Sequence, residues 1–175
     1  GFNFACESRS CELEDDVEPP SEGDACIEWL RYKGCGACEY YRCREQEFQC
    51  GESGYLIGYV GKYCDRFSTV TEPKASRRAA EWLGKVRRCL VTEFESRTDL
   101  SMSCEDIDRI GTESHADCYV ESGFCDLNVR DWFTIVHSID PGDIPLQQIM
   151  ATGHKCIRTW FGFPRQTLRG AVEID

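Results

Sequence analysis

Apolar side chains recur at intervals of three and four residues through much of the chain, which is the spacing of one helix face. Pro73 ends a stripe that begins after Ser53 and consists of Leu56, Tyr59, Val60, Tyr63, Cys64 and Phe67. The clearest helix lies in "ASRRAAEWLGKVRRCLVTEF", whose apolar side is Ala79, Trp82, Leu83, Val86, Cys89, Leu90 and Phe94. Alternating strand patterns are scarce, so we predict an all-α bundle of about five to six helices.

The segments on either side give a less regular pattern. Ser21 and Asp24 have the spacing of a capping box, and Gly34 is a natural helix stop. The helix between them would place Cys26, Trp29, Leu30 and Lys33 at helical spacing. Residues 35–52 have no clear period, and we interpret them as a cysteine-rich connection.

Three further helices are predicted in the second half of the chain. Ser103 and Asp106 are typical of a helix start, and that helix would bury Ile107, Ile110 and Cys118. Asp126 is the predicted cap of the next helix, whose buried side would be Val129, Trp132, Phe133 and Val136. Pro145 suits the first turn of the last helix, which would bury Leu146, Ile149, Met150, Gly153, Cys156 and Ile157.

A chain of 175 residues is long enough to bury one core, so we expect one domain. Residues 1–22 form an acidic arm, residues 23–158 the helical domain, and residues 159–175 a tail without sustained period. Trp160, Phe161 and Phe163 lie near Arg158 and Arg165. They are either an exposed contact patch or part of a packed tail.

Thirteen cysteines and a net charge of −11 narrow the class of protein. Cytosolic glutathione would keep so many thiols reduced, whereas an oxidising compartment would pair them, so we predict a secreted, extracellular protein. No apolar run approaches the ~20 residues that span a bilayer. The first residues lack the features of a signal peptide, and we interpret the chain as a mature form whose leader has been removed. The acidic charge argues against a nucleic-acid partner.

Zinc or thiol catalysis would need a different arrangement of cysteines and histidines. Only Cys35 and Cys38 have CxxC spacing, and the three histidines, His115, His137 and His154, are not paired in sequence. By contrast, five cysteines fall on the predicted inner stripes of five different helices: Cys26, Cys64, Cys89, Cys118 and Cys156. Inward cysteines at helix contacts are what disulfide stapling requires.

The gaps between cysteines carry a resemblance to a known family. Eight residues separate Cys26 from Cys35, and the four gaps from Cys64 through Cys89, Cys104 and Cys118 to Cys125 are 24, 14, 13 and 6 residues. With the phrases "KYCDRF", "VRRC" and "ADCYVESGFC", this framework resembles the stanniocalcins, secreted disulfide-linked helical glycoprotein hormones. The resemblance covers roughly Cys26 to Cys156.

The resemblance implies a pairing. Its definite bridges are Cys35–Cys64, Cys50–Cys104, Cys89–Cys118 and Cys125–Cys156. Cys26 would join Cys38 or Cys43, of which we favour Cys43. A local Cys6–Cys11 bridge would then leave Cys38 as the candidate unpaired cysteine, available to link a homodimer.

Two departures from the family are visible. No cysteine follows Cys156, although stanniocalcins usually dimerise through a cysteine beyond the last internal bridge. Asn3 and Asn128 are the only asparagines, and neither begins an N-glycosylation sequon.

No catalytic constellation, cofactor motif or metal site is predicted. "YKGCGAC" and "SHADCY" faintly echo the calcium loop and histidine motif of secreted phospholipases, but Cys35 and His115 lie too far apart in sequence, and Ala116 interrupts the expected His-Asp pair. The acidic clusters "CELEDDVE", "CEDID" and "SIDPGD" lack the spacing of a dedicated calcium loop. We expect solvated acidic faces that bind calcium weakly at most.

The resemblance therefore implies a hormone-like regulatory protein that acts by binding and not by catalysis. Its partner would be an extracellular receptor or a protease that it inhibits, in a role connected with calcium or phosphate handling. The alternative is a secreted carrier whose stapled helices enclose a small apolar ligand or chromophore.

Overall fold

The computed structural model describes residues 25–32, 34–143 and 146–161. All regular structure in these ranges is helical, and they contain no strand, which confirms the all-α prediction. The α-helices are α1 (Glu39–Phe48), α2 (Lys62–Arg66), α3 (Arg77–Arg97), α4 (Cys104–Glu121), α5 (Val129–His137) and α6 (Leu146–Trp160). The predicted acidic arm, and the tail beyond residue 161, lie outside the described residues.

Shorter helical turns fill most of the connections. The 3₁₀ turns are η2 (Cys26–Arg31), η3 (Gly34–Cys38), η6 (Glu72–Lys74), η7 (Phe124–Asp126) and η8 (Pro141–Asp143). Two π-helical turns, η4 (Tyr55–Gly61) and η5 (Phe67–Thr71), flank α2. One helical run therefore extends from Tyr55 to Lys74, and it ends one residue after Pro73, where the sequence predicted a stop.

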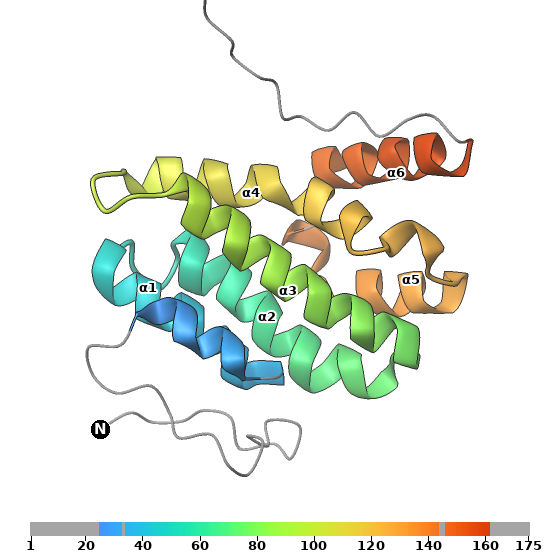
Figure 1. Cartoon of the computed structure of the whole chain (residues 1–175), viewed down its shortest axis with the longest axis horizontal. Helices are drawn as coiled ribbons and strands as arrows, with labels where there is room; N and C mark the ends of the chain where they lie inside the picture. The colour runs from blue at the N-terminus through green and yellow to red at the C-terminus, as the bar shows by residue number, and fades with distance from the viewer. Residues whose placement is uncertain (1–24, 33, 144–145, 162–175) are drawn as a thin grey trace, which may run out of the picture.

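The long helices α3 and α4 lie side by side across the middle of the molecule (Figure 1). The run that contains α2 packs below them, α1 and η2 lie at one end, and α5 and α6 lie at the other. Two clusters form the core. One centres on Tyr40, Tyr41, Tyr55, Leu56 and Phe94, and the other on Trp82, Leu83, Leu90, Leu127 and Ile135. Because α3 contributes to both clusters, it joins the two ends of the bundle.

The predicted inner stripes of the central helices are confirmed. Leu56, Val60 and Tyr63 are buried in the run around α2. The buried side of α3 includes Ala79, Trp82, Leu83, Val86, Leu90 and Phe94, as the sequence predicted. Helix α4 begins at Ser103, whose Oγ accepts a hydrogen bond from the N–H of Asp106 at 3.2 Å. This serine cap is the helix start that the sequence indicated.

The N-terminal prediction needs two corrections. Cys26–Arg31 is a six-residue 3₁₀ turn and not an α-helix up to Gly34. Within the supposed connection 35–52, residues Glu39–Phe48 form α1. Its buried residues are Tyr40 and Tyr41, which are neighbours in sequence. Since adjacent residues give no three- or four-residue spacing, a period search misses this helix.

The orientation of α5 was predicted wrongly for three of its four apolar residues, while the fourth, Trp132, is half-buried and packs against the core as predicted. The buried residues of α5 are Asp131 and Ile135, whereas Val129, Phe133 and Val136 are 75%, 71% and 42% exposed. The reason is polar. The Asp131 carboxylate accepts hydrogen bonds from the Ser76 N–H at 3.0 Å, the Ser76 hydroxyl at 2.6 Å and the Asn128 side-chain amide at 2.6 Å. These bonds draw the opposite side of the helix inward. Asn128, not Asp126, caps α5.

The prediction for α6 was also partly wrong. Cys156 is buried as expected, together with Thr152. Ile149, Met150 and Ile157, which were expected in the core, are 46%, 67% and 50% exposed. Helix α6 packs on α4, and the Lys155 ammonium pairs with the Asp117 carboxylate across that contact. The more apolar side of the helix is left outside.

Ser76 joins the start of α3 to the buried side of α5. Substitution of Ser76 therefore tests whether its bonds to Asp131 hold α5 in the observed orientation. Its Oγ also accepts the Ala79 N–H at 3.2 Å and so caps α3. Ser76→Ala should lower the free energy of unfolding by about 2–4 kcal/mol, because the cap is lost and a buried carboxylate loses one partner. Urea unfolding followed by circular dichroism measures the change.

Ser103→Ala is the matched control. Ser103 also caps a helix and bonds an aspartate, but the side chain of its partner Asp106 is about half exposed and belongs to the same helix. The expected loss is only about 1 kcal/mol. Equal losses in the two variants would show that the Ser76–Asp131 bond does not anchor α5.

Candidate functional site

Five disulfides tie the described helices together. They are Cys26–Cys43, Cys38–Cys64, Cys50–Cys104, Cys89–Cys118 and Cys125–Cys156. The Cα–Cα separations run from 5.1 to 5.7 Å, within the range that disulfides occupy. Four bridges join the partners that we expected, including the favoured Cys26–Cys43. Five bridges fit an oxidising compartment, while secretion itself stays a prediction.

The fifth bridge corrects the pairing that the resemblance implied. Cys64 is bonded to Cys38 and not to Cys35, so Cys38 is neither unpaired nor available to link a homodimer. Cys38 is the last residue of η3 and is fully buried. Cys35 precedes it by about one turn of the same 3₁₀ helix. A count of residues between cysteines distinguishes poorly between two cysteines that are one turn apart.

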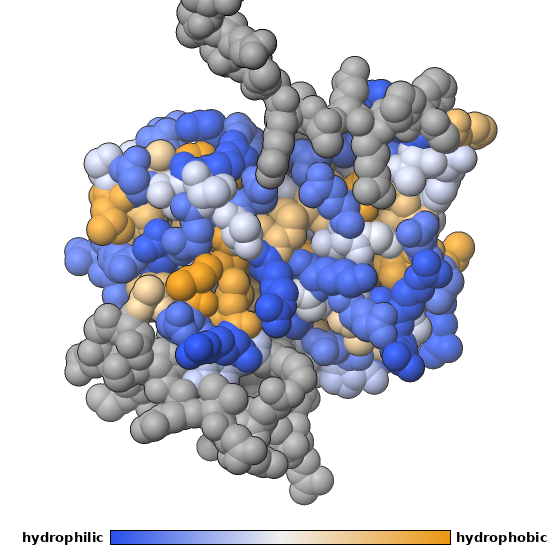
Figure 2. Space-filling view, in the orientation of Figure 1, coloured by the Kyte–Doolittle hydropathy of each residue, from blue (hydrophilic) through white to orange (hydrophobic). Residues whose placement is uncertain are grey.

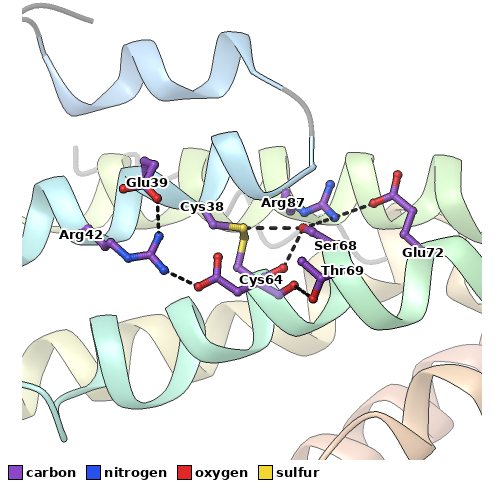
Figure 3. Close-up of a disulfide and its surroundings, with 9 residues drawn as sticks. Cys38, Glu39, Arg42, Cys64, Ser68, Thr69, Glu72 and Arg87 are labelled. Atoms are coloured by element: carbon purple, nitrogen blue, oxygen red, sulfur yellow. Dashed lines mark hydrogen bonds and ion pairs between the residues drawn. A yellow bond between two sulfur atoms is a disulfide. The ribbon is translucent and has the colours of Figure 1, made fainter. Parts of the chain in front are cut away.

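The buried Cys38–Cys64 bridge lies beside a set of polar side chains (Figure 3). The Ser68 hydroxyl donates to the Cys64 carbonyl at 2.8 Å and lies 3.7 Å from Cys38 Sγ. The Arg87 guanidinium donates to Ser68 Oγ at 2.9 Å and to the Glu72 carboxylate at 2.8 Å. On the other side, Arg42 pairs with Glu39 and Asp65. This cluster connects η3, the run around α2, and α3, which is a structural role.

Three of the thirteen cysteines remain, because five bridges use ten. Cys6 and Cys11, with the proposed bridge between them, lie outside the described residues, as does the side chain of Cys35. Three cysteines cannot all pair with one another. At least one of them therefore needs a partner outside these 175 residues or keeps its thiol.

The corrected bridge can be tested directly. Digestion without reduction should yield a peptide pair joined through Cys38 and Cys64, identified by mass spectrometry. Replacing both residues by alanine should lower the free energy of unfolding by about 3–4 kcal/mol, because the bridge restricts a loop of about 26 residues in the unfolded chain. Recovery of a Cys35–Cys64 peptide pair instead would refute the assignment.

Of the acidic clusters that the sequence analysis considered for calcium, Asp106, Asp140 and Asp143 pair with basic groups. Asp140 pairs with Lys62 and Arg66, and Asp143 accepts hydrogen bonds from Lys62 at 2.7 Å and from the Tyr63 hydroxyl at 2.6 Å. The hydrogen bonds from Arg66 and Lys62 lower the pKa of Asp140 to about 2. Asp106 likewise bonds Ser103 and Arg109. Among the described residues, no group of three or more His, Cys, Asp or Glu side chains could hold a metal ion.

His115, which the sequence indicated to be an ordinary polar-face residue or one with its hydrogen bonds satisfied internally, is buried on α4 among aromatic rings. Its ring makes edge-on contacts with Tyr55, Tyr59 and Tyr119 at 6.3, 6.0 and 5.6 Å between centroids. Its Nδ1–H donates to the Gly111 carbonyl at 2.8 Å. A cavity of about 40 Å³ lies beside it, lined in part by Tyr59, Trp82 and Tyr119. Sites for drug-sized molecules occupy about 300–1,000 Å³, so this cavity does not suit the carrier hypothesis.

Burial makes His115 sensitive to acid. Loss of solvation lowers its pKa from 6.5 to about 4, and the bonds to the Gly111 and Thr112 carbonyls oppose this only in part. The unfolded chain therefore binds more protons than the folded chain between these two pH values. The contribution of neutral His115 to stability is fully present above about pH 6.5 and is lost as the pH falls towards 4.

We predict that the free energy of unfolding falls by about 2–3 kcal/mol from pH 7 to pH 4.5 on account of this one group. His115→Leu should remove that part of the slope, measured by urea unfolding at both pH values. His154→Gln, which changes an exposed histidine, should retain it. If His115→Leu left the slope unchanged, the histidine would not be the acid-sensitive group.

The outward sides of α5 and α6 are both apolar, and we call the two sides together the α5–α6 surface. It consists of Val129, Phe133, Val136, Ile149, Met150, Ile157, Trp160 and Phe161, which are 42–75% exposed. Figure 2 shows a few hydrophobic side chains at the right-hand edge of the molecule, where these two helices lie, and a larger hydrophobic group left of centre, with polar side chains over most of the rest of the face drawn. Apolar surfaces of this kind mark interaction sites.

A column of aromatic rings supports this surface from inside. Trp82 in the core contacts Phe124 at 5.3 Å between ring centroids, Phe124 stacks on Trp132 at 5.7 Å, and Trp132 stacks on Trp160 at 5.9 Å. The Trp160 indole N–H donates to the Cys125 carbonyl at 3.1 Å, next to the Cys125–Cys156 bridge. The stack of Trp132 on Trp160 joins α5 to α6 and therefore fixes the exposed stripes of the two helices relative to each other.

The charges around this surface differ from those of the whole molecule. Helix α6 contains Lys155 and Arg158 and no acidic residue, and the only acidic residue of α5, Asp131, is buried. Within the part of the chain that the structure describes, neither Arg130 nor Arg158 forms an ion pair. An apolar surface with basic neighbours therefore lies on a strongly acidic protein.

Only part of this surface was predicted from the sequence. Trp160 and Phe161 were expected either in an exposed contact patch or in a packed tail, and both are exposed, while Phe163 and Arg165 lie outside the described residues. Phe133 and the α5 stripe were expected in the core. The signal that could have corrected this is Asp131, because a carboxylate near a helix start can bond to a neighbouring chain segment and turn that side inward.

Comparisons with protein-family models, with curated proteins and with solved structures each gave no match to this chain. The stanniocalcin resemblance therefore remains a prediction from the cysteine framework. No helix of the described residues combines the length and the apolar character needed to cross a membrane.

Proposed function

We propose that this chain is an extracellular regulatory protein that acts by binding a protein partner through the α5–α6 surface. The observation that carries the proposal is the outward orientation of the apolar stripes on α5 and α6. A helix normally buries its apolar stripe because exposure to water is unfavourable, by roughly 25 cal/mol per Å². Two neighbouring helices that both present this side outward gain that free energy when a partner covers them.

The rigidity of the support favours specific binding. The Cys125–Cys156 bridge fixes α6 to η7, and the Trp132–Trp160 stack fixes α6 to α5. A surface that is already in its binding conformation loses little conformational entropy on association. Aromatic side chains such as Trp160 and Phe133 are also the residue types that contribute most to binding energy at protein interfaces.

The partner class follows from the family resemblance. We propose an extracellular receptor or protease as partner, in a role connected with calcium or phosphate handling. The carrier alternative would require room for a ligand, and the described cavity beside His115 offers about 40 Å³. Two of its polar lining groups, Arg87 and His115, are used in the bundle itself, where they bond Glu72 and Gly111.

A photo-crosslinking amino acid at position 133 tests the proposal. The labelled protein is incubated with extracellular fluid from its source, and the crosslinked partner is identified by mass spectrometry and purified. We expect Phe133→Asp to weaken binding of that purified partner by about tenfold or more, measured by calorimetry, because it places a charge within the apolar contact. If the partner is a protease, its peptidase rate is measured with and without the protein.

Leu100→Asp is the matched control, because Leu100 is 65% exposed and lies in the loop between α3 and α4. This change should leave partner binding unaltered. Equal binding by the wild type and the two variants would exclude the α5–α6 surface as the contact.

A further inference from the structure

We propose that the α5–α6 surface binds an apolar helical segment with acidic flanks, which crosses α6 at Gly153. This inference rests on the proposed function and adds the chemistry of the partner. Two independent observations carry it: an exposed glycine in the middle of the apolar stripe of α6, and unpaired basic side chains beside that stripe.

Gly153 has no role inside the described molecule. It lies within α6 and is exposed, and a Cβ atom built on it would have no heavy atom within 4 Å. Glycine inside a helix is about 1 kcal/mol less favourable than alanine. Packing within the described residues therefore does not require a glycine at this position.

Gly153 lies between two large apolar side chains on the exposed side of α6. Ile149 and Ile157 lie four residues before and after it, on the same side of α6, and both are about half exposed. The apolar stripe thus has a flat gap between two large side chains. The distance between packed helices depends on the size of the side chains at the crossing point. A partner helix would approach α6 closely at Gly153 and contact an isoleucine on either side.

This gap favours a protein partner over a lipid surface. Lipid chains are fluid and gain most from large apolar side chains, which a glycine does not supply. An amphipathic helix in contrast inserts a defined row of side chains, spaced by three and four residues, into a shaped surface. The glycine gap and the flanking isoleucines are a surface of that kind.

The charges select the flanks of the partner. Arg130 directly follows the exposed Val129 on α5, and Arg158 directly follows Ile157 on α6. Neither is paired within the described residues, and His137 and His154 are exposed on the same two helices. Carboxylates of a partner would meet unpaired guanidinium groups, whereas basic flanks would be repelled. Charge complementarity of this kind sets partner choice and association rate.

Two model peptides test the chemistry. One is an amphipathic helix of about 18 residues, about five turns long, built from leucine, alanine and glutamate, and the other has each glutamate replaced by lysine. We expect the acidic peptide to bind the full chain about tenfold or more tightly than the basic peptide, measured by calorimetry in low salt. Arg158→Glu should reduce this preference, and the matched change Arg88→Glu, on an exposed position of α3, should not.

Gly153→Ala tests the crossing point without the risk of a misfolded variant. Alanine fits without a clash and favours the helix, so the thermal unfolding midpoint should rise. Affinity for the acidic peptide should nevertheless fall about fivefold or more, because the added methyl group keeps the two helices apart. A more stable variant that binds less well is an outcome that a merely structural role for Gly153 would not give.

Four outcomes would overturn the inference: equal binding of both peptides, unchanged affinity after Gly153→Ala, binding of wild type to phosphatidylserine vesicles but to neither peptide, or self-association that buries this surface in sedimentation experiments. The natural partner separates this failure from a failure of the proposed function. If Phe133→Asp weakens that partner while Gly153→Ala and Arg158→Glu do not, the binding function stands and the acidic helix is wrong. If Phe133→Asp has no effect on the partner, both are wrong.

Discussion

The hydrogen bonds between Asp131 and Ser76 decide which side of α5 faces the bundle, and the exposed apolar surface depends on that choice. Each of the other five α-helices carries at least one cysteine that is bonded to another segment, but α5 carries none. Its orientation therefore depends on noncovalent contacts alone. The buried carboxylate has three donors around it, and rotating the helix would leave those donors and the carboxylate without partners.

The disulfides and the aromatic column stabilise different parts of the bundle. At the end of the bundle where Tyr40, Tyr41 and Tyr55 join aliphatic side chains in the core, the Cys50–Cys104 bridge ties the start of α4 to the segment after α1, and Cys26–Cys43 ties η2 to α1. The column from Trp82 to Trp160 crosses from the core to the surface at the end where α5 has no covalent link. Support from two kinds of interaction explains how a surface that is itself unfavourable in water keeps one conformation.

Sequence patterns predicted the central part of this fold because burial there follows helical spacing. In α3 the apolar residues recur over the whole helix, so position and inner side are both determined. The pattern fails where its physical basis is absent: Tyr40 and Tyr41 are adjacent and give no period. In α5 the pattern reveals an apolar side but not its direction, because direction depends on what Asp131 meets in space. Cys35 and Cys38 show the same limit for disulfides, since spacing along the chain does not resolve a single helical turn.

The candidate surface was therefore only partly visible in the sequence. Trp160 and Phe161 could be predicted as a candidate contact patch because they follow the last helical stripe, whereas the spacing of Phe133 placed it in the core. The stacked pair of Trp132 and Trp160 has a further consequence. One ring of the pair is exposed and the other is half-buried, and their indoles are close enough for their electronic transitions to interact. Contact with Trp160 will therefore change the near-ultraviolet dichroism and the emission spectrum of the pair, which gives this molecule a built-in optical reporter of what touches it.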